Sequence, residues 1–423
     1  MKRILFFAAA AFSGIVAFAQ NPISPAGVYI ADPTGRVNPD GKMYVYGSLD
    51  VTPGRYCSKD YHVLSSENLR DWILYEKSFT NDMDLYAPDM IHKDGTYYLY
   101  YDTPRGDEWV ATSDSPTGPF KDGVKIEGPR QIDPNVFIDD DGQAYYFWGQ
   151  FSAKGARMNP DMKTIDPTTV KDGIVTEAGH FFHEGSFVFK RNGWYYFIYA
   201  DISRKNTPTC IGYAMSRNVM GPDEYKGVIV DNDGCNPGNW NNHGSVVEYD
   251  GQWYVLYHRS THGCNTMRKA CIEPIFFNED GTIREAEMTS QGAAGPLDAF
   301  GQIDAARACL LNGNVRIVLS QDREILSEVR SGDSAGWKYL DFGKGTSKVH
   351  IRVRTKAEAS LSLSIDQPWN RGVARISVPD TNGEWQVFSA DTGSIEGIHA
   401  LWMSVMSRSG INDLFEIDWI KFE

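Results

Sequence analysis

The chain has 423 residues, a formal net charge of -14 and 13% aromatic residues. An acidic surface repels phosphate backbones and anionic headgroups, which argues against nucleic acid and anionic membrane partners. The length allows about two to three domains. The six cysteines match no metal-binding spacing, and the pairs Cys264–Cys271 or Cys210–Cys235 are open alternatives to free thiols.

The first residues have the organisation of an export signal. Lys2 and Arg3 precede an apolar stretch over residues 4–18, and Ala17-Phe18-Ala19 fits a cleavage site. The stretch is too short for a membrane anchor, so we expect no membrane insertion. The first cysteine beyond the cleavage point is Cys57, which argues against a lipid-anchored form. We predict a signal peptide over residues 1–19 and a soluble mature protein that is periplasmic or secreted.

One pattern recurs five times in the first two-thirds of the chain. Each copy is a strand, an Asp-Gly or Asn-Gly hairpin signal, and a second strand rich in aromatic residues. The turn glycines are Gly41, Gly95, Gly142, Gly193 and Gly251. A spacing of about 45–60 residues is typical of propeller blades. We predict a five-bladed β-propeller over residues 20–290, with blades at about 28–80, 86–121, 132–176, 183–230 and 242–287.

The composition changes after Ser290. Residues 291–301 are rich in Gly, Ala and Pro and are predicted to include a linker. Beyond them, residues 349–354 and 360–365 alternate strictly between polar and apolar, as strands with one buried face do. We predict a β-sandwich (jelly-roll) domain over residues 302–423. The predicted fold class is therefore all-β, a five-bladed β-propeller followed by a β-sandwich.

Four chemically active side chains occupy corresponding positions in the repeats. Each of them precedes its turn glycine by eight or nine residues: Asp32, Asp133, Glu184 and His243. Because the innermost strands of a propeller begin near the axis, these side chains are expected to converge on one pocket. A single Asp-Pro pair is more often a turn former. Three acids in phase with one repeat instead favour a functional site, since buried carboxyl groups are costly.

Paired carboxyl groups are the chemistry of glycoside hydrolysis. One carboxylic acid protonates the leaving oxygen and one carboxylate activates water, and inverting enzymes separate the two by about 6.5–9.5 Å. A third carboxylate can keep the acid protonated through like-charge repulsion. Neutral sugars need no basic patch, and the many Tyr and Trp residues suit sugar stacking. We therefore predict a carbohydrate partner.

These stretches resemble the three signature acids of glycoside hydrolase family 43. The likeness covers about residues 25–290 and is carried by Asp32-Pro33, by Asp133-Pro134-Asn135 within residues 132–142, and by Glu184-Gly185-Ser186. The resemblance implies a five-bladed propeller and an inverting mechanism. It also implies that Asp32 is the general base, Glu184 the general acid, and Asp133 the modulator that orients Glu184 and keeps it protonated.

Five further residues are candidates for the site. His243 resembles the axial histidine of the family, which often contacts calcium through water, and a hydrogen-bonding role without metal is the alternative. Arg268 resembles the arginine that contacts sugar hydroxyls, with a surface salt bridge as the alternative. Tyr86 stands where the family frequently has Trp and is expected to form a pocket wall. Asp50 is expected to reach a sugar hydroxyl or to form a turn, and Trp240 to cap the pocket or to belong to the blade core.

Residues 302–423 resemble a family 6 carbohydrate-binding module. The likeness is carried by residues 336–343, 383–386 and 414–419. Such modules usually open with alternating acids that help to bind calcium, and this chain keeps only Asp304 of them. The cofactor expected is structural Ca²⁺, at the propeller axis, in this domain or in both, with no organic cofactor. Trp369 and Asn412 are candidate sugar contacts, and the alternative is a domain that only packs against the propeller.

The predicted activity is that of an exported, monomeric, exo-acting glycosidase. It would remove terminal α-L-arabinofuranosyl residues from plant polysaccharides or oligosaccharides by inversion. A β-D-xylosidase or a β-D-galactofuranosidase shares the catalytic frame and stays an alternative. A propeller that binds glycans without hydrolysing them would be expected to lack a signature acid, and none is missing. A retaining fructan-active enzyme needs an Asn-Asp-Pro-Asn context, whereas Ala31 precedes Asp32 here.

Overall fold

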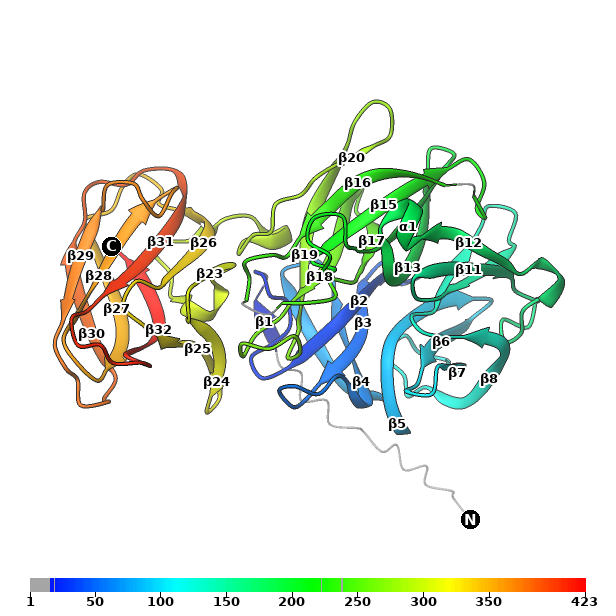
Figure 1. Cartoon of the computed structure of the whole chain (residues 1–423), viewed down its shortest axis with the longest axis horizontal. Coiled ribbons are helices and arrows are strands. Elements are labelled where there is room, and N and C mark those ends of the chain that lie inside the picture. Colours follow the sequence, from blue (N-terminus) through cyan, green and yellow to red (C-terminus); the bar gives the residue numbers. More distant parts are fainter. Residues whose placement is uncertain (1–15, 19, 222, 237–238) are drawn as a thin grey trace, which may run out of the picture.

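The computed structural model describes residues 16–18, 20–221, 223–236 and 239–423, almost all of them in β-sheets or the turns between them (Figure 1). The predicted signal peptide lies outside the described residues except for β1 (Val16–Phe18), which pairs antiparallel with β5 (Asp71–Lys93). In the described part of the chain, no helix is both long and apolar enough to cross a membrane.

Five four-stranded antiparallel blades follow one another between Tyr29 and Arg284, which confirms the predicted β-propeller. The long strand β5 serves two blades, since its first part pairs with β4 and its second part with β6. The first two blades contain β2 (Tyr29–Val37), β3 (Met43–Asp50), β4 (Ser58–Ser66), β5, β6 (Thr96–Asp102), β7 (Asp107–Ser113) and β8 (Lys121–Arg130). The third and fourth contain β9 (Asn135–Ile138), β10 (Ala144–Trp148), β11 (Ser152–Arg157), β12 (Lys171–Thr176), β13 (Phe182–Arg191), β14 (Trp194–Asp201), β15 (Cys210–Ser216) and β16 (Glu224–Asp231). The fifth contains β17 (Ser245–Tyr249), β18 (Gln252–Arg259), β19 (Lys269–Phe277) and β20 (Ile283–Arg284).

Helical structure among the described residues is limited to single turns. These are η1 (Pro167–Thr169), α1 (Glu177–His180), η2 (Gly292–Ala294) and η3 (Ala305–Arg307). In three of the five hairpins both residues of the turn signal have positive φ angles, namely Asp94-Gly95, Asn192-Gly193 and Asp250-Gly251. Between β13 and β14, Asn192 and Gly193 have φ angles of 49° and 71°. Both values are positive, as a type I′ turn requires, and this turn matches the twist of the paired strands.

Two boundaries differ from the sequence expectation. The second blade was expected to end near residue 121, but β8 pairs with β7 as far as Arg130. The glycines and the proline of β8 have a low propensity for β-strands, so the sequence does not indicate a strand there. Pairing with β7 in the folded sheet outweighs this low propensity. Within the predicted linker 291–301, β21 (Leu297–Asp298) pairs with β26 (Ser334–Asp341), and Leu297 lies in the sandwich core. The sandwich therefore begins inside that stretch, because a buried leucine cannot belong to a solvated linker.

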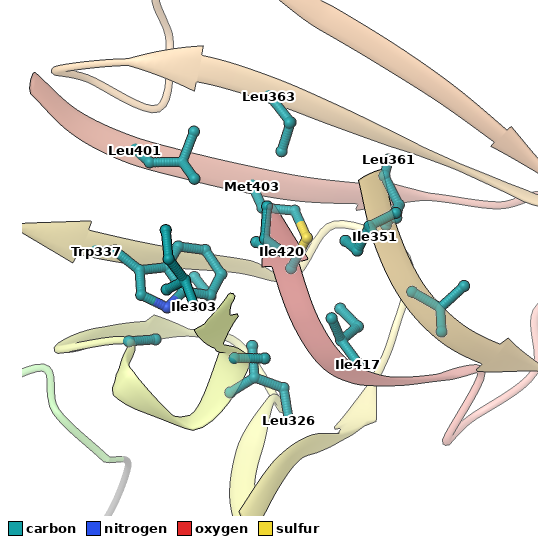
Figure 2. Close-up of a cluster of buried hydrophobic side chains, with 14 of the residues drawn as sticks. Ile303, Leu326, Trp337, Ile351, Leu361, Leu363, Leu401, Met403, Ile417 and Ile420 are labelled. Atoms are coloured by element: carbon teal, nitrogen blue, oxygen red, sulfur yellow. The ribbon is translucent and has the colours of Figure 1, made fainter. Parts of the chain in front are cut away.

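The C-terminal residues form two packed sheets, as predicted. One sheet has the order β21-β26-β31-β28-β29 with β23 on β26, and the other has β24-β25-β32-β27-β30 with β22 on β32. Apolar residues from both sheets fill the space between them, as Figure 2 shows for Trp337, Leu361 and Ile420. The remaining strands are β22 (Ile303–Asp304), β23 (Leu310–Asn312), β24 (Arg316–Ser320), β25 (Arg323–Val329), β27 (Lys348–Thr355), β28 (Ala359–Ile365), β29 (Ala374–Val378), β30 (Gln386–Asp391), β31 (Ile398–Met406) and β32 (Phe415–Phe422).

The sandwich packs against the last two blades of the propeller (Figure 1). The backbone N–H of Leu311 donates to the carbonyl of Gly234 at 2.7 Å. The buried Lys269 of β19 donates to both carboxylate oxygens of Glu324 in β25, at 2.6 and 2.5 Å. A buried ion pair and backbone hydrogen bonds therefore hold the two parts together.

Candidate active site

The strands that carry the predicted acids are irregular at the acids themselves. The pairing of β2 with β3 shifts register between Ala31 and Thr34, and that of β13 with β14 shifts between Glu184 and Phe187. Asp32 has a φ of 51° and Asp133 a φ of 62°, both in the left-handed region that non-glycine residues rarely adopt. Bulges of this kind re-aim a side chain. Here they allow acids from separate blades to reach one cavity.

One small cavity gathers most of the predicted site residues. Its volume is about 160 Å³, and its lining is Asp32, Tyr56, Cys57, Tyr86, Ala87, Ile132, Asp133, Glu184, Asn241, His243 and Arg268. Pockets for drug-sized ligands are larger, at about 300–1,000 Å³. The cavity therefore suits one monosaccharide unit.

Asp32 is held as a carboxylate. Its Oδ2 accepts a hydrogen bond from the Ser48 hydroxyl at 2.7 Å, and its Oδ1 accepts one from Nη1 of Arg268 at 2.8 Å. Its backbone N–H donates to Nδ1 of His258 at 3.1 Å. Burial raises the pKa of Asp32, but the positive charge of Arg268 and the other partners outweigh burial and hold the pKa below its usual value. An ionised carboxylate of this kind can accept a proton from water.

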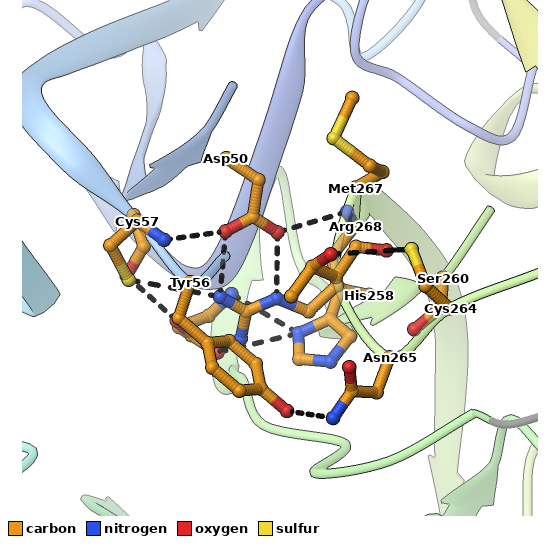
Figure 3. A network of polar contacts seen from close by, with 12 residues as sticks. Asp50, Tyr56, Cys57, His258, Ser260, Cys264, Asn265, Met267 and Arg268 are labelled. Atoms are coloured by element: carbon orange, nitrogen blue, oxygen red, sulfur yellow. Dashed lines mark hydrogen bonds and ion pairs between the residues drawn. The ribbon is translucent and has the colours of Figure 1, made fainter. Parts of the chain in front are cut away.

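Asp50 lies behind Arg268 and does not line the cavity (Figure 3). Arg268 donates to Asp50 from Nε at 2.9 Å, from Nη2 at 3.0 Å and from its backbone N–H at 3.1 Å. The backbone N–H of Cys57 donates to Asp50 at 2.9 Å. The expected contact between Asp50 and a sugar hydroxyl is therefore not supported, because the carboxylate is fully buried and its oxygens are occupied. Asp50 instead fixes the guanidinium that faces Asp32.

Asp133 and Glu184 form the other side of the carboxyl cluster. Burial raises the pKa of Asp133, and the charges of Glu184, Asp102 and Asp32 raise it further. Oε2 of Glu184 accepts a hydrogen bond from Nε2 of Gln150 at 2.8 Å. The cluster thus contains one carboxylate, Asp32, whose pKa is held low, beside one carboxyl group, Asp133, whose pKa is raised. Carboxyl groups with pKa values shifted apart are typical of sites for acid–base catalysis.

His243 lies between the acids. Its Nδ1 is 3.7 Å from Oδ1 of Asp32 and 4.0 Å from Oδ2 of Asp133. Burial lowers the pKa of His243 despite the neighbouring carboxylates, so the ring is neutral near pH 7. Gly185, with a φ of 78°, packs on this ring, and a Cβ there would lie 2.9 Å from His243. Only glycine fits directly after Glu184.

The side chains that the structure describes do not form a complete set of calcium ligands. Ca²⁺ takes 6–8 oxygen ligands, and the described residues contain no group of three or more His, Cys, Asp or Glu side chains placed to hold a metal. His243 offers one ring nitrogen. A calcium ion at the axis would therefore depend on water for most of its ligands. In the sandwich, Asp304 is exposed and belongs to no such group either.

Of the two aromatic candidates in the propeller, one lines the cavity and the other does not. Tyr86 lines the cavity, as predicted from its place in the second blade. Trp240 is not among the lining residues, and its ring lies edge-on to His183, with centroids 6.0 Å apart. Trp240 therefore contacts the residue that directly precedes the proposed acid, Glu184. In the sandwich, Trp369 is 79% exposed and Asn412 is exposed as well.

Sequence reasoning missed several residues of the site. Tyr56, Cys57 and Asn241 line the cavity, and Gln150 contacts Glu184. One signal was present for Gln150, which follows the second strand of its blade much as Asp50 ends the second strand of the first. The loop residues carried no comparable signal. All six cysteines are free thiols, so neither of the two pairings considered is formed.

Comparison with known proteins places this site in a family. Residues 20–283 match Glycosyl hydrolases family 43, and residues 314–423 match Carbohydrate binding module (family 6). A xylosidase/arabinosidase of Thermoclostridium stercorarium is 31% identical over 466 residues, covering 91% of this chain and 95% of the relative.

Two solved structures resemble the fold. A GH43 beta-xylosidase/alpha-arabinofuranosidase from a compost microbial metagenome, in complex with xylotriose and in a calcium-free form, is 30% identical with a TM-score of 0.56, covering 64% of this chain and 99% of that one. An arabinoxylan arabinofuranohydrolase from Bacillus subtilis, in complex with cellotetraose, shares the fold at 22% identity and a TM-score of 0.54, covering 95% of this chain and 97% of that one. The carboxyl cluster in its propeller cavity and the match over residues 20–283 lead to one conclusion: the chain belongs to glycoside hydrolase family 43 and is an inverting glycosidase.

Proposed function

We propose that this enzyme removes single terminal α-L-arabinofuranosyl residues from plant polysaccharides or oligosaccharides. The observation that carries the proposal is the cavity of about 160 Å³ with Asp32, Asp133 and Glu184 in its wall. A cavity of that size favours exo action on one sugar unit over binding of a long chain. The Thermoclostridium relative is named for xylosidase and arabinosidase activities, which supports a pentose as the substrate.

In the proposed reaction, Asp32 is the general base. Its carboxylate takes a proton from a water molecule as the water oxygen bonds to the anomeric carbon of the terminal sugar. Glu184 is the general acid and gives its proton to the glycosidic oxygen as the bond to that oxygen breaks. The configuration at the anomeric carbon inverts because water attacks from the face opposite the leaving group.

Neighbouring side chains support the different roles of Asp32 as base and Glu184 as acid. Arg268, fixed by Asp50, stabilises the negative charge of Asp32 before the reaction. Asp133 lines the same cavity as Glu184, and whenever its carboxyl group is ionised its negative charge opposes loss of the proton from the acid. Gln150 orients Glu184 by donating to its Oε2. The arrangement supports Asp32 as the ionised base and Glu184 as the proton donor of the proposed reaction.

A β-D-xylosidase on the same frame is the second candidate, because the metagenome neighbour is described with both activities. The test is hydrolysis of 4-nitrophenyl α-L-arabinofuranoside, β-D-xyloside and β-D-galactofuranoside by the wild type and by Glu184→Gln. Glu248→Gln, at an exposed position of the fifth blade, is the matched control.

We expect the arabinofuranoside to be cleaved fastest and Glu184→Gln to lose activity by about 10²–10⁴-fold, the usual contribution of a general acid. An aryl leaving group needs less help from the acid, so the loss should be larger on an oligosaccharide. Preferred cleavage of the β-xyloside would replace the proposed sugar. A Glu184→Gln variant as active as the wild type would refute the acid assignment, and a wild type inactive on aryl glycosides and on oligosaccharides would favour a binding role.

The proposal includes export and a monomeric state. The basic residues Lys2 and Arg3, the apolar stretch and the Ala17-Phe18-Ala19 site support a cleaved signal peptide. N-terminal sequencing of protein from the producing cells should begin at Gln20, and a chain that retains Met1 would contradict export by this route. Light scattering of the purified protein should give the mass of one chain.

A further inference from the structure

Asp102 is a fourth carboxyl group next to the catalytic cluster. It is the last residue of β6, lies opposite Tyr86 of β5, and is fully buried. It is not part of the cavity lining, so it does not reach the sugar. Its Oδ1 instead accepts a hydrogen bond from the backbone N–H of Asp133 at 3.3 Å.

This hydrogen bond acts on a residue in a rare conformation. Asp133 has a φ of 62°, and a non-glycine residue keeps such a backbone only where the surrounding structure holds it. The direction of the Asp133 side chain depends on that backbone. Asp102 therefore contributes to where the Asp133 carboxyl group points, although it lies outside the cavity.

The second carboxyl oxygen of Asp102 has an unusual environment. Oδ2 is buried and has no hydrogen-bond partner among the described residues, and buried polar atoms without a partner are uncommon. Burial raises the pKa of Asp102, and the charges of Asp32 and Glu184 raise it further, against the Asp133 N–H. The titratable groups that face Asp102 are the carboxyls of Asp32, Glu108, Asp133 and Glu184 and the phenols of Tyr61, Tyr86 and Tyr146.

We propose that Asp102 is a positioning residue for the hydrolytic reaction, one that holds the Asp133 backbone in place and adds a carboxyl group that helps the cluster to keep its catalytic proton at higher pH. This inference rests on the proposed roles of Glu184 and Asp133. No cationic side chain contacts Asp102 in the described structure, so the negative charges of Asp32 and Glu184 oppose its ionisation, and an ionised Asp102 would in turn oppose loss of a proton from Glu184.

A natural control lies in the fourth blade. Asp201 ends β14 as Asp102 ends β6, is equally buried, and also has an Oδ2 without a hydrogen-bond partner. Its Oδ1 accepts from the backbone N–H of Ser203 at 2.6 Å. None of the catalytic acids is among the groups that shift its pKa. Asp201→Asn therefore tests the general effect of neutralising a buried strand-end acid.

The experiment compares pH profiles of kcat/KM for wild type, Asp102→Asn, Asp102→Ala and Asp201→Asn on the preferred aryl glycoside, with the unfolding midpoint of each variant measured in parallel. Asn keeps an oxygen that can accept from Asp133 but cannot ionise, whereas Ala has no acceptor. We expect Asp102→Asn to keep its plateau and to move the alkaline limb down by about one pH unit, a tenfold loss above the limb. Asp102→Ala should also lower the plateau by about tenfold.

The outcomes separate this inference from the proposed function. An Asp102→Asn profile that superimposes on the wild type, or an equal shift in Asp201→Asn, would overturn the role in proton retention. An unchanged plateau in a folded Asp102→Ala variant would overturn the role in holding Asp133. If Glu184→Gln were as active as the wild type, the assignment of Glu184 as the general acid would be refuted, whatever the result for the Asp102 variants.

Discussion

Replacement of Arg268 by methionine should affect both the stability and the pH dependence of the enzyme. The Arg268 side chain is 1% exposed and its guanidinium joins two carboxylates, with Nη1 at 2.8 Å from Asp32 and Nε at 2.9 Å from Asp50. Methionine is long enough to fill much of the space but carries no charge. Both carboxylates would then stay buried without their main partner.

The size of the effect follows from that burial. Removing one partner of a buried ion pair costs about 3–5 kcal/mol, because the remaining charge is uncompensated. Two carboxylates share Arg268, and Asp50 would retain only the backbone N–H groups of Cys57 and of position 268 among its present partners. We therefore expect Arg268→Met to lower the free energy of unfolding at pH 7 by at least about 3 kcal/mol.

The sign of the pH effect follows from Asp32. Its pKa is lowered in the folded protein, so its pairing stabilises the fold fully above the unfolded carboxyl value of about 3.9 and is lost as the pH falls through the folded value. Without Arg268, burial dominates and the pKa of Asp32 rises. The acidic limb of kcat/KM should therefore move to higher pH in Arg268→Met.

Urea denaturation at pH 7 and the pH profile of kcat/KM measure the two effects. Arg268→Lys keeps the charge but cannot bridge both carboxylates with a planar fork, so its losses should be smaller. Arg217→Met, at an exposed arginine of the fourth blade, is the control for loss of an arginine. An Arg268→Met variant with the urea midpoint and the acidic limb of the wild type would refute this account of Asp32.

Three further changes test other contacts. Gln150→Leu removes the amide that donates to Glu184 at 2.8 Å and should lower kcat/KM on an aryl glycoside about tenfold; an unchanged rate would show that Glu184 needs no such support. Glu324→Gln leaves the buried Lys269 without its carboxylate and should cost about 3 kcal/mol in urea denaturation, whereas an unshifted transition would make this ion pair dispensable. Trp369→Ala removes a 79% exposed indole and should weaken sedimentation with insoluble arabinoxylan while aryl glycoside hydrolysis stays unchanged; full retention on the polymer would exclude Trp369 as a contact.

The sequence by itself was sufficient for the architecture. Each Asp-Gly or Asn-Gly signal marks the first hairpin of one blade, because those residues favour the tight turns that join antiparallel strands. The strict alternation in residues 349–354 and 360–365 placed one face of β27 and β28 in a core, where Ile351 and Leu361 lie. Turn preferences and the alternation of polar and apolar residues depend on a few neighbouring positions, so both can be recognised in the amino-acid sequence.

The three acids of the site could also be predicted from the sequence, since their positions repeat with the same period as the blades. Asp32, Asp133 and Glu184 precede their turn glycines by equal intervals, and equivalent positions of a propeller meet at its axis. The structure brings all three to one cavity with His243, Arg268 and Tyr86. Their individual roles remain predictions for the variants above.

Only the tertiary structure decided how those acids are supported. Arg268 contacts Asp50 across 218 positions of sequence, and Asp102 accepts from Asp133 across 31. These contacts join different blades, so no local pattern reports them. The sequence offered Asp50 as a sugar contact, whereas the fold buries it behind Arg268. Burial and charge are properties of the assembled neighbourhood, and they set which carboxyl group is ionised, so the division between base and acid depends on how the blades pack around the axis.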